Sequence, residues 1–528
     1  MSENRDRLLR KGDYVQGSFL KPEQVDGYLN GVNPGDRSDV LGRFPFSEAS
    51  ADQAVEFAAS AARLWRRVPL HDRAVAVRRF REALAQYQES TAVLLTREVG
   101  KPLWESRQEV QATLRALDLH LDDGLLLLAP RVIEEIGARS DRMPRGTTAI
   151  LAPFAFPLLV PAVQCAAAVL AGNSVVFKPS KFTPGVGQAI AELFDRCRLP
   201  RGVFNLVHGP GAVIGQRLVA NPLVDMVVFT GNHTTHQALR QATLDRPELP
   251  IAAFTGGKGV ALVLDDANLD QAVYEVMVGA YLTSGQRHNS TGRVMVTDAV
   301  YDQFVGALVQ RIERLSVGYG FDPDVFMGPL VSENLRTRYR RFARKMASKG
   351  HKALVEAGHE VPGRRGFYAN PCLYQVDWEN GSPMLTEEPP GPTLLVYRVP
   401  GWEEAVALHN QVDARLATSV FTTLENSAMP ELRERLRTGA INFNRGTIGA
   451  SMRLPAIGLG RCGNGSPGGL ELLHMLTHPR SPLVERRPFE TLARLPGVRW
   501  DSTFVPAPEE ETEEDDIDLS GSLELALE

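Results

Sequence analysis

The stretch "FPLLVPAVQCAAAVLAGNSVVF", residues 156–177, decides the fold class of this chain. Its apolar length first suggests a membrane span, but four residues interrupt it: Pro161, Gln164, Gly172 and Asn173. A spanning helix needs about 20 consecutive apolar residues, whereas a helix that ends at a glycine before a short β-branched strand accommodates these interruptions. We therefore predict a buried helix followed by a buried strand, and no membrane segment.

Short runs rich in β-branched residues alternate with longer helical segments around this stretch. The runs are "TTAILAP" (147–153), "SVVFKP" (174–179), "VFNLVHG" (203–209), "MVVFTG" (226–231) and "PIAAFTGG" (250–257). Such alternation is typical of βαβ units on a parallel sheet with helices on both faces. We expect an α/β fold whose ligands bind beyond the carboxyl ends of the strands.

Three helical patterns precede the first of these strands. They are "SEASADQAVEFAASAARLW" (47–65), "HDRAVAVRRFREALAQYQESTAVLLTREVG" (71–100) and "LWESRQEVQATLRALDLHLDDGLLLL" (103–128). Ser50 and Gln53 have the spacing of a capping box, so we expect the first helix to be capped at Ser50. Each pattern has the apolar periodicity of one helix.

The composition is that of a soluble protein with two or three domains: 528 residues, 43% hydrophobic and 23% charged. The chain opens on a polar segment rather than a secretory signal, so we expect a cytoplasmic protein. Its four cysteines form no C-x-x-C pair, which disfavours a zinc site and fits a reducing compartment. We expect no metal. The cysteines are Cys165, Cys197, Cys372 and Cys462.

The C-terminal end is strongly acidic. Residues 501–528 hold 11 Asp and Glu and no Lys or Arg, so the net charge of −5 leaves +6 on residues 1–500. We expect residues 506–528 to form a disordered acidic tail, which offers a contact to a protein partner. Its end, "IDLSGSLELALE", is similar to the Gly-Ser-Leu peptides that address cargo to bacterial encapsulin shells. This charge distribution does not indicate nucleic-acid binding.

Several motifs in fixed order resemble the aldehyde dehydrogenase superfamily, and within it most resemble succinylglutamate-semialdehyde dehydrogenases. They include "EVGKP", "AGNSVVFKPS", "VVFTG", "TSGQR", "TEEPPGP" and "GAINFN". The resemblance implies a Rossmann-like dinucleotide-binding domain (10–125 and 146–252), a catalytic-type α/β domain (253–450) and a small β-arm for oligomerisation (126–145 and 470–500). It also implies a homo-oligomer.

The family's catalytic groups are a cysteine nucleophile, a glutamate that activates water and an asparagine that holds the oxyanion. By the resemblance, the nucleophile position after "GQR" is His288, and the general-base position before the Gly-Gly turn is Phe254. The oxyanion position, two residues before the proline of "APFAFP", is Ala155. All three chemical groups are therefore expected to be missing.

The cofactor positions are better kept. Lys178 follows a strand directly, and Gly231 opens a helix whose N-terminal amides would face an anion. Lys181 stands where the family usually has a glutamate that accepts hydrogen bonds from the adenosine ribose, so NADP is favoured over NAD. Pro389 and Pro390, after Glu388, change the loop of the nicotinamide-ribose glutamate. The expected cofactor residues are Lys178, Ser180, Lys181, Gly211, Thr230, Gly231 and Glu388.

Two functions follow, and both stay open at this point. The first is a relative of succinylglutamate-semialdehyde dehydrogenase that is inactive in the family reaction and acts by nucleotide binding or by assembly. The second is an NAD(P)-dependent oxidoreductase that oxidises an aldehyde to a carboxylic acid by altered chemistry, with His288 as a candidate nucleophile. The resemblance by itself does not decide whether the chain is an enzyme or has kept its cofactor.

Overall fold

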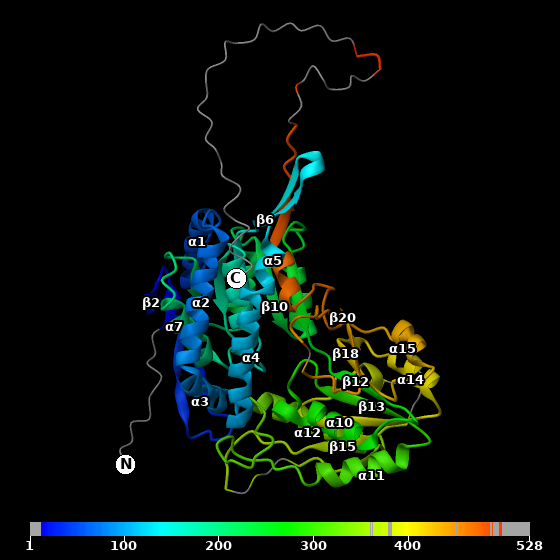
Figure 1. Cartoon of the computed structure of the whole chain (residues 1–528). Helices are drawn as coiled ribbons and strands as arrows, with labels where there is room; N and C mark the ends of the chain where they lie inside the picture. The colour runs from blue at the N-terminus through cyan, green and yellow to red at the C-terminus, as the bar shows by residue number, and fades with distance from the viewer. Residues whose placement is uncertain are drawn as a thin grey trace, which may run out of the picture. The chain divides into compact units, whose positions relative to one another are not determined.

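The computed structural model describes residues 12–358, 361, 363–377, 383–449, 451–485, 488 and 496–498. The chain divides into a larger unit, residues 1–131 and 139–481, and a smaller unit, residues 132–138 and 482–528. The larger unit contains two seven-stranded sheets, which Figure 1 draws with their helices. The predicted tail, residues 506–528, lies outside the described residues.

The first sheet has the strand order β11-β10-β7-β8-β9-β1-β2. Strands β7 to β11 run parallel, and each falls in one of the five predicted runs, so the α/β prediction is confirmed. Strands β1 and β2 extend the sheet antiparallel. The bounds are β1 (Asp13–Val15), β2 (Ser18–Leu20), β7 (Thr147–Leu151), β8 (Ser174–Lys178), β9 (Phe204–Leu206), β10 (Met226–Gly231) and β11 (Ile251–Thr255).

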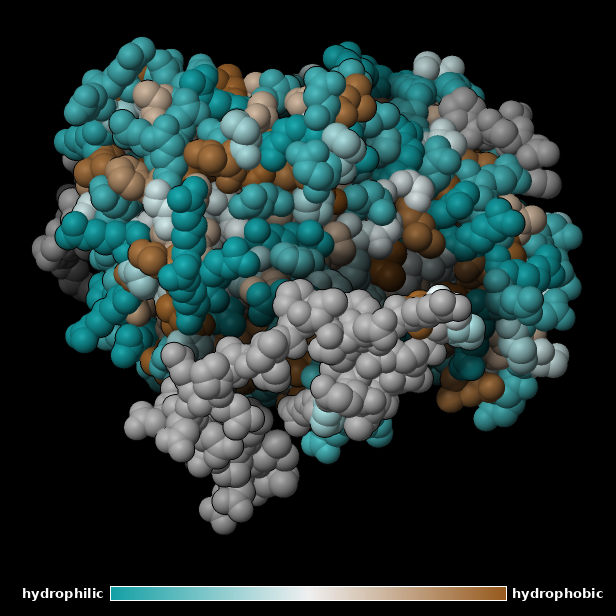
Figure 2. Space-filling view, turned by 90° about the horizontal axis from the view of Figure 1, so that it is seen from above, coloured by the Kyte–Doolittle hydropathy of each residue, from teal (hydrophilic) through white to brown (hydrophobic). Residues whose placement is uncertain are grey.

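Helix α6 (Leu159–Leu170) and strand β8 form the predicted helix and strand of the deciding stretch. Pro161 lies in the first turn of α6, where its missing N–H has no intrahelical acceptor to lose. The chain then turns at Gly172, whose φ of 92° is left-handed. Within the described residues, no helix is both long and apolar enough to cross a membrane. The face in Figure 2 is mostly hydrophilic, with hydrophobic residues scattered over it.

Alternate residues of β7 and β8 enter two different cores, because both faces of the sheet are covered. Leu151 and Val176 pack in the core that contains α1 (Glu48–Trp65). Ile150 and Phe177 pack in the core that contains α6. This double burial explains why the predicted runs are continuously apolar instead of alternating.

The first helix begins three residues earlier than the capping-box spacing predicts. Ser47 is the N-cap of α1, and its hydroxyl accepts a hydrogen bond from the Ser50 backbone N–H at 3.3 Å. The prediction of Ser50 was wrong because the Ser50 hydroxyl has another partner: it donates to Asp13 Oδ2 at 2.7 Å.

The other two helical patterns each divide. Tyr87, with φ −103° and ψ 21°, separates α2 (Leu70–Gln86) from α3 (Gln88–Val99). Asp122, with φ −101° and ψ −89°, separates α4 (Leu103–Leu121) from α5 (Asp123–Leu128). The prediction of one helix per pattern was wrong because apolar periodicity continues across a single non-helical residue.

The second sheet has the order β14-β15-β16-β13-β12-β18-β19, and β14 is its only antiparallel strand among the described residues. Val260 and Leu262 of β12 pack in the core of α12 and α14, whereas Ala261 and Val263 pack in that of α10 and α11. The bounds are β12 (Gly259–Val263), β13 (Thr291–Thr297), β14 (Lys352–Val355), β15 (Cys372–Gln375), β16 (Thr393–Val399), β18 (Ala417–Phe421), β19 (Ala440–Phe443), α10 (Leu269–Tyr281), α11 (Tyr301–Ile312), α12 (Glu333–Ser348) and α14 (Trp402–His409).

Shorter elements complete the described chain. The other bounds are β3 (Gly27–Val32), β4 (Val40–Phe46), β5 (Arg131–Ile133), η1 (Glu134–Ile136), β6 (Ala138–Pro144), α7 (Pro184–Asp195), η2 (Gly211–Gly215), α8 (Gln216–Ala220), α9 (His233–Gln241), η3 (Leu282–Gly285), α13 (Pro383–Thr386), β17 (Ala414–Arg415), α15 (Met429–Arg435), β20 (Leu459–Gly460), η4 (Gly469–Glu471), α16 (Leu472–Met475) and β21 (Thr477–Arg480). Strand β6 pairs antiparallel with β21 inside the predicted arm segments. The oligomerising role of the arm and the domain bounds stay predictions.

Asp13 is a buried carboxyl that joins β1, α1 and the end of β9. Its Oδ1 accepts from the His208 backbone N–H at 2.8 Å, and its Oδ2 accepts from Ser50. Burial raises its pKa to about 7 from an ordinary value near 3.8, although both hydrogen bonds oppose this rise. The folded state therefore binds more protons than the unfolded state between pH 4 and 7, and the free energy of unfolding falls as pH rises through this window.

Replacing Asp13→Asn should remove this pH dependence, because an amide can accept from His208 and donate to the Ser50 hydroxyl without ionising. A shift of about three pKa units corresponds to about 4 kcal/mol. We expect the free energy of unfolding of the variant, minus that of the wild type, to rise by up to that amount as pH increases from 4.5 to 7.5, measured by urea unfolding. A difference that stays constant with pH would contradict the assignment.

Candidate functional site

Residue 288 follows a turn with unusual backbone geometry. Thr283, Ser284 and Gly285 have φ values of 57°, 55° and 64°, which is left-handed. A left-handed β-branched residue costs about 1–3 kcal/mol, so the surrounding structure must hold it. The Ser284 hydroxyl donates to the Gly328 carbonyl at 2.8 Å. A Cβ at position 285 would lie 2.2 Å from the Gly391 carbonyl oxygen, so only glycine fits.

A buried ion pair between Arg287 and Glu105 supports the turn. Arg287 donates through Nη2 to Glu105 Oε1 at 2.8 Å and through Nε to the Thr283 hydroxyl at 2.7 Å. Thr283 in turn donates to Glu105. Glu105 lies on α4 and its side chain is 1% exposed. Helix α4 therefore holds the left-handed turn through one carboxylate.

A second buried pair also lies beside the Phe156 ring. Lys101 Nζ is 2.5 Å from Glu109 Oε2, and Glu109 Oε1 accepts from the Leu158 and Leu159 backbone N–H groups. The Lys101 ammonium lies 4.4 Å from the Phe156 ring centroid. The Arg287 guanidinium lies 4.8 Å from the same centroid. This ring brings the loop that contains Ala155 against the turn of residue 288.

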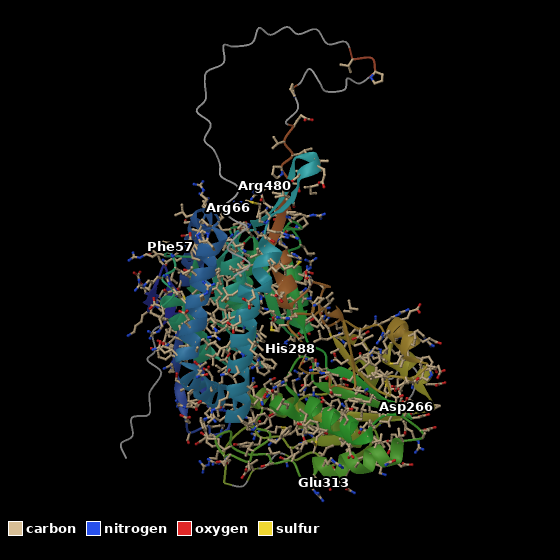
Figure 3. All side chains as sticks on the ribbon, in the orientation of Figure 1. Phe57, Arg66, Asp266, His288, Glu313 and Arg480 are labelled. Atoms are coloured by element: carbon tan, nitrogen blue, oxygen red, sulfur yellow. The ribbon has the colours of Figure 1, made fainter. Side chains whose placement is uncertain are left out.

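His288 lies at the junction of the two sheets and is partly buried; Figure 3 labels it. The Gly-Gly turn after β11 packs on it, since a Cβ at Gly256 would be 2.8 Å from His288 Cδ2. Burial lowers the pKa of His288 below its ordinary value, although the charge of Glu388 opposes this effect. The imidazole is therefore neutral at pH 7. It is a weak base in this position.

Phe254 and Ala155 are apolar neighbours of the same junction. Phe254 is the last but one residue of β11 and forms an isolated bridge to Gly463; its ring would be 3.1 Å from a Cβ at Gly468. Ala155 is 1% exposed and adjoins Phe156. Gly256, two residues after Phe254, packs on His288, and Phe156, next to Ala155, lies beside Arg287; that the three positions form one site stays a prediction. At these positions the structure places a methyl group, a benzyl ring and a neutral imidazole.

Cys462 is a thiol that contacts the Gly-Gly turn. It is fully buried, and its Sγ is 3.7 Å from the Gly257 carbonyl oxygen. Burial, above all, raises the pKa of Cys462 to about 12. The group is a thiol at neutral pH and is not a ready nucleophile, because nucleophilic attack needs the thiolate.

Lys258 is a site residue that the sequence motifs did not reveal. It follows the Gly-Gly turn, is 2% exposed and donates to the Gly391 carbonyl. Burial lowers its pKa to about 8, while the nearby charge of Glu388 raises it. Glu388, itself exposed, therefore acts on both Lys258 and His288.

The predicted cofactor lysines lie together at the end of β8. Lys178 is buried, and its Nζ donates to the Pro179 carbonyl at 2.7 Å. Burial, followed by the charge of Lys181, lowers the pKa of Lys178 to about 8. Lys181 is exposed, with its Nζ 5.1 Å from the Phe182 ring centroid. Two amines thus face the same strand end, and an anion there would stabilise both charges.

The other predicted cofactor residues surround the same edge of the sheet. Ser180 Oγ accepts from the Phe182 backbone N–H at 3.3 Å, and Thr230 Oγ1 accepts from Gln164 at 3.3 Å. Gly231 accepts through its carbonyl from Gly256, which links the cofactor edge to the turn on His288. At Gly211 an added Cβ would meet nothing within 4 Å, so its backbone faces open space.

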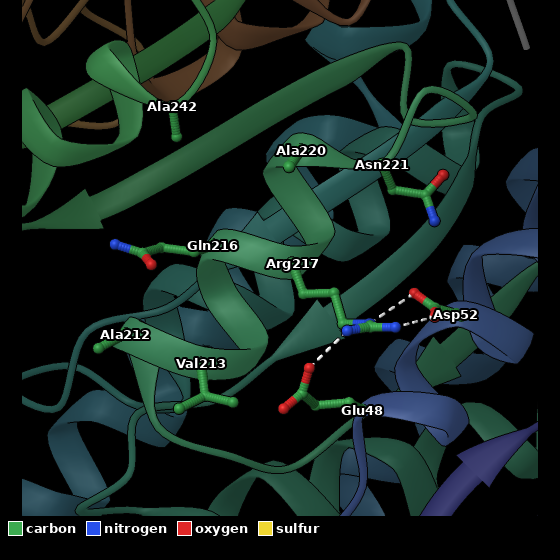
Figure 4. Close-up of a pocket in the computed structure, with 9 residues that line it drawn as sticks. All are labelled: Glu48, Asp52, Ala212, Val213, Gln216, Arg217, Ala220, Asn221 and Ala242. Atoms are coloured by element: carbon green, nitrogen blue, oxygen red, sulfur yellow. Dashed lines mark hydrogen bonds and ion pairs between the residues drawn. The ribbon is translucent and has the colours of Figure 1, made fainter.

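A pocket of about 630 Å³ lies beside α8 and the preceding π-helical turn η2 (Figure 4). Ala212, Gln216 and Ala220 form one helical face toward it, because they are four residues apart. Arg217 on the neighbouring face is held by Asp52 at 2.6 Å and by Glu48. The lining residues are Glu48, Asp52, Ala212, Val213, Gln216, Arg217, Ala220, Asn221 and Ala242.

His208 is a second residue that the motifs missed, although it lies three residues before Gly211, one of the expected cofactor positions. It is fully buried, and neither ring nitrogen has a hydrogen-bond partner in the described structure. Burial, reinforced by the charge of Lys178, lowers its pKa to about 3. A neutral, unsatisfied imidazole therefore lies behind the cofactor edge.

Comparison with known proteins identifies the family. The model of the aldehyde dehydrogenase family matches residues 19–481. The chain is 29% identical to the α-ketoglutaric semialdehyde dehydrogenase of Bacillus subtilis (strain 168), over 85% of this chain and 92% of the relative. It is 30% identical to the N-succinylglutamate 5-semialdehyde dehydrogenase of Burkholderia thailandensis (strain ATCC 700388 / DSM 13276 / CCUG 48851 / CIP 106301 / E264), over 91% and 99%.

A solved structure agrees in fold. The crystal structure of lactaldehyde dehydrogenase from Escherichia coli superposes with a TM-score of 0.83 at 29% identity, covering 90% of this chain and 98% of that one. The predicted fold and the predicted resemblance to succinylglutamate-semialdehyde dehydrogenases are thereby confirmed. This chain belongs to the aldehyde dehydrogenase family.

Proposed function

We propose that this family member is silent in the oxidation of aldehydes and acts by nucleotide binding or by assembly. The observation that carries the proposal is the junction of His288, Phe254 and Ala155. None of these side chains supplies a thiolate, a carboxylate base or an amide donor. Cys462 does not replace the nucleophile, because burial keeps it protonated.

The expected losses in kcat support the proposal that the chain is catalytically inactive. Loss of a nucleophile costs a hydrolase on the order of 10⁶ in kcat, and loss of one oxyanion donor costs roughly 10²–10³. These effects are not additive, yet either makes turnover negligible beside that of an intact enzyme.

The second candidate is an NAD(P)-dependent oxidoreductase that oxidises an aldehyde to a carboxylic acid by altered chemistry. The observation that favours it is the charge of Glu388 beside His288. A carboxylate near an imidazole stabilises its cationic form, and an acyl-imidazole is hydrolysed more readily than a thioester. The addition of a neutral imidazole to an aldehyde is much less favourable than that of a thiolate, which ranks this function second.

A nicotinamide dinucleotide is the proposed ligand, with NADP preferred to NAD. Lys178 and Lys181 present two amines at one strand end, and Lys181 is exposed to meet a 2′-phosphate. Ser180, Gly211, Thr230, Gly231 and Glu388 are proposed to complete the site. The pocket beside α8 is proposed to hold the adenosine, and alanines line it together with charged and polar residues.

The proposed setting is a cytoplasmic homo-oligomer. Its four cysteines are all free and buried, which fits a reducing compartment. Strands β6 and β21 lie in the segments proposed to pair subunits. The acidic C-terminal segment, residues 506–528, is proposed as the contact to a protein partner. No role in nucleic-acid binding is proposed.

Restoring three groups should restore the family reaction if the scaffold is intact. We expect wild-type protein to form no NADPH or NADH with semialdehydes at 340 nm. The variant His288→Cys, Phe254→Glu and Ala155→Asn should gain measurable turnover, whereas Ala155→Asn alone should not. Turnover by the wild type that His288→Ala abolishes would instead establish the second function. A thermal melt of each variant checks that it folds.

The preference for NADP should depend on Lys181. We expect NADP at 100 times its Kd to stabilise the protein by about 2.7 kcal/mol, seen as a higher Tm, with a smaller effect of NAD at equal concentration. Lys181→Glu should weaken NADP binding at least tenfold, because it places an anion beside the 2′-phosphate. Arg78→Glu makes the same charge change elsewhere and serves as the control. If neither dinucleotide shifts the Tm at millimolar concentration, the nucleotide proposal is wrong.

A further inference from the structure

Helix α12 carries a basic face that nothing in the proposed function uses. Its buried side chains, Tyr339, Phe342 and Met346, pack in the core beneath the second sheet. The opposite side of the helix faces solvent. From residue 336 to residue 352 the sequence contains eight Lys and Arg and no Asp or Glu.

Little of this charge is neutralised inside the chain. Arg336 pairs with Glu333 at 2.5 Å, and Lys345 pairs with Glu387. No other basic residue from 336 to 352 has an ionic partner among the residues that the structure describes. The six basic residues without an ionic partner are exposed, except Arg340, which is partly buried and whose Nε has no hydrogen-bond partner in the described structure. They are Arg338, Arg340, Arg341 and Arg344 on α12, Lys349 directly after it, and Lys352 at the start of β14. We name them the α12 basic face.

Such a face is unfavourable for an isolated helix. Helices usually place opposite charges three or four residues apart, and like charges at that spacing repel. Here Arg340 and Arg344 are four apart, as are Arg341 and Lys345. At 1.5 Å per residue, the track from residue 338 to residue 349 is about 16 Å long. An external anion of similar length would relieve the repulsion.

We propose that the α12 basic face binds the acidic segment 509–518 of a second copy of this chain. That segment has eight Asp and Glu in ten residues and no Lys or Arg. Guanidinium groups bind carboxylates with two parallel hydrogen bonds, which suits an arginine-rich face. The segment is present in the same number as the face, because every copy carries one of each.

The length of the C-terminal segment allows this occupant. Residues 499–528 can span up to roughly 100 Å when extended, so the segment can reach a neighbouring copy. This inference rests on the proposed role of the C-terminal segment as a partner contact and is independent of dinucleotide binding.

Fluorescence anisotropy with a labelled peptide of residues 506–528 and the full-length protein tests the inference. We expect saturable binding at 50 mM NaCl that weakens at least tenfold at 300 mM, because exposed charge pairs are screened by salt. The variant Arg338→Glu, Arg341→Glu and Arg344→Glu should lose at least tenfold in affinity. The control variant Arg67→Glu, Arg78→Glu and Arg115→Glu makes the same change of net charge at exposed positions and should bind as the wild type does.

Equal affinities of the two variants would overturn the inference, since binding would then depend on net charge alone. So would a DNA oligonucleotide of equal charge that displaces the peptide at lower concentration, because it would identify a nucleic-acid surface. Tm shifts caused by dinucleotides, measured on the same variants, distinguish failure of this inference from failure of the nucleotide proposal. Loss of peptide binding with unchanged Tm shifts contradicts only this inference. Loss of the Tm shifts with unchanged peptide binding contradicts only the nucleotide proposal.

Discussion

Two buried ion pairs around Phe156 are the constraint on which the site depends. Arg287, paired with Glu105, and Lys101, paired with Glu109, place cations 4.8 Å and 4.4 Å from the centroid of one aromatic ring, and all four side chains are largely buried. Removal of one partner from a buried pair costs about 3–5 kcal/mol, because it leaves a buried charge without compensation. These pairs hold three segments in one arrangement: α4, the loop before α6, and the left-handed turn that precedes residue 288.

The scaffold around the reaction centre is therefore built independently of the groups that would react there. The turn needs Gly285 and the support of Glu105, but it places no chemical demand on residue 288 itself. The Gly-Gly turn packs on His288 through its backbone. A chain can lose a thiolate, a base and an amide donor at such a centre and keep its fold, since none of these groups supports the packing.

Burial has the largest electrostatic effect in this site. The pKa values of Lys178 and Lys258 fall to about 8, and that of His288 falls below its ordinary value, mainly because each group is desolvated. Glu388 opposes this effect at both Lys258 and His288. An anionic ligand at the strand ends would stabilise the cations further, which is the physical reason for assigning a phosphate-bearing nucleotide to this edge.

The sequence by itself determined the α/β class, the five parallel strands and their continuously apolar character in the doubly covered sheet, because these follow from local periodicity and β-branched runs. The order of family motifs also predicted residues 155, 254 and 288 as one site. Tertiary structure decided the rest. Ser50 is not the helix cap because Asp13, 37 residues away, engages its hydroxyl. Lys258, His208 and the two ion pairs acquire their character only on burial, and burial depends on contacts between segments far apart in the chain.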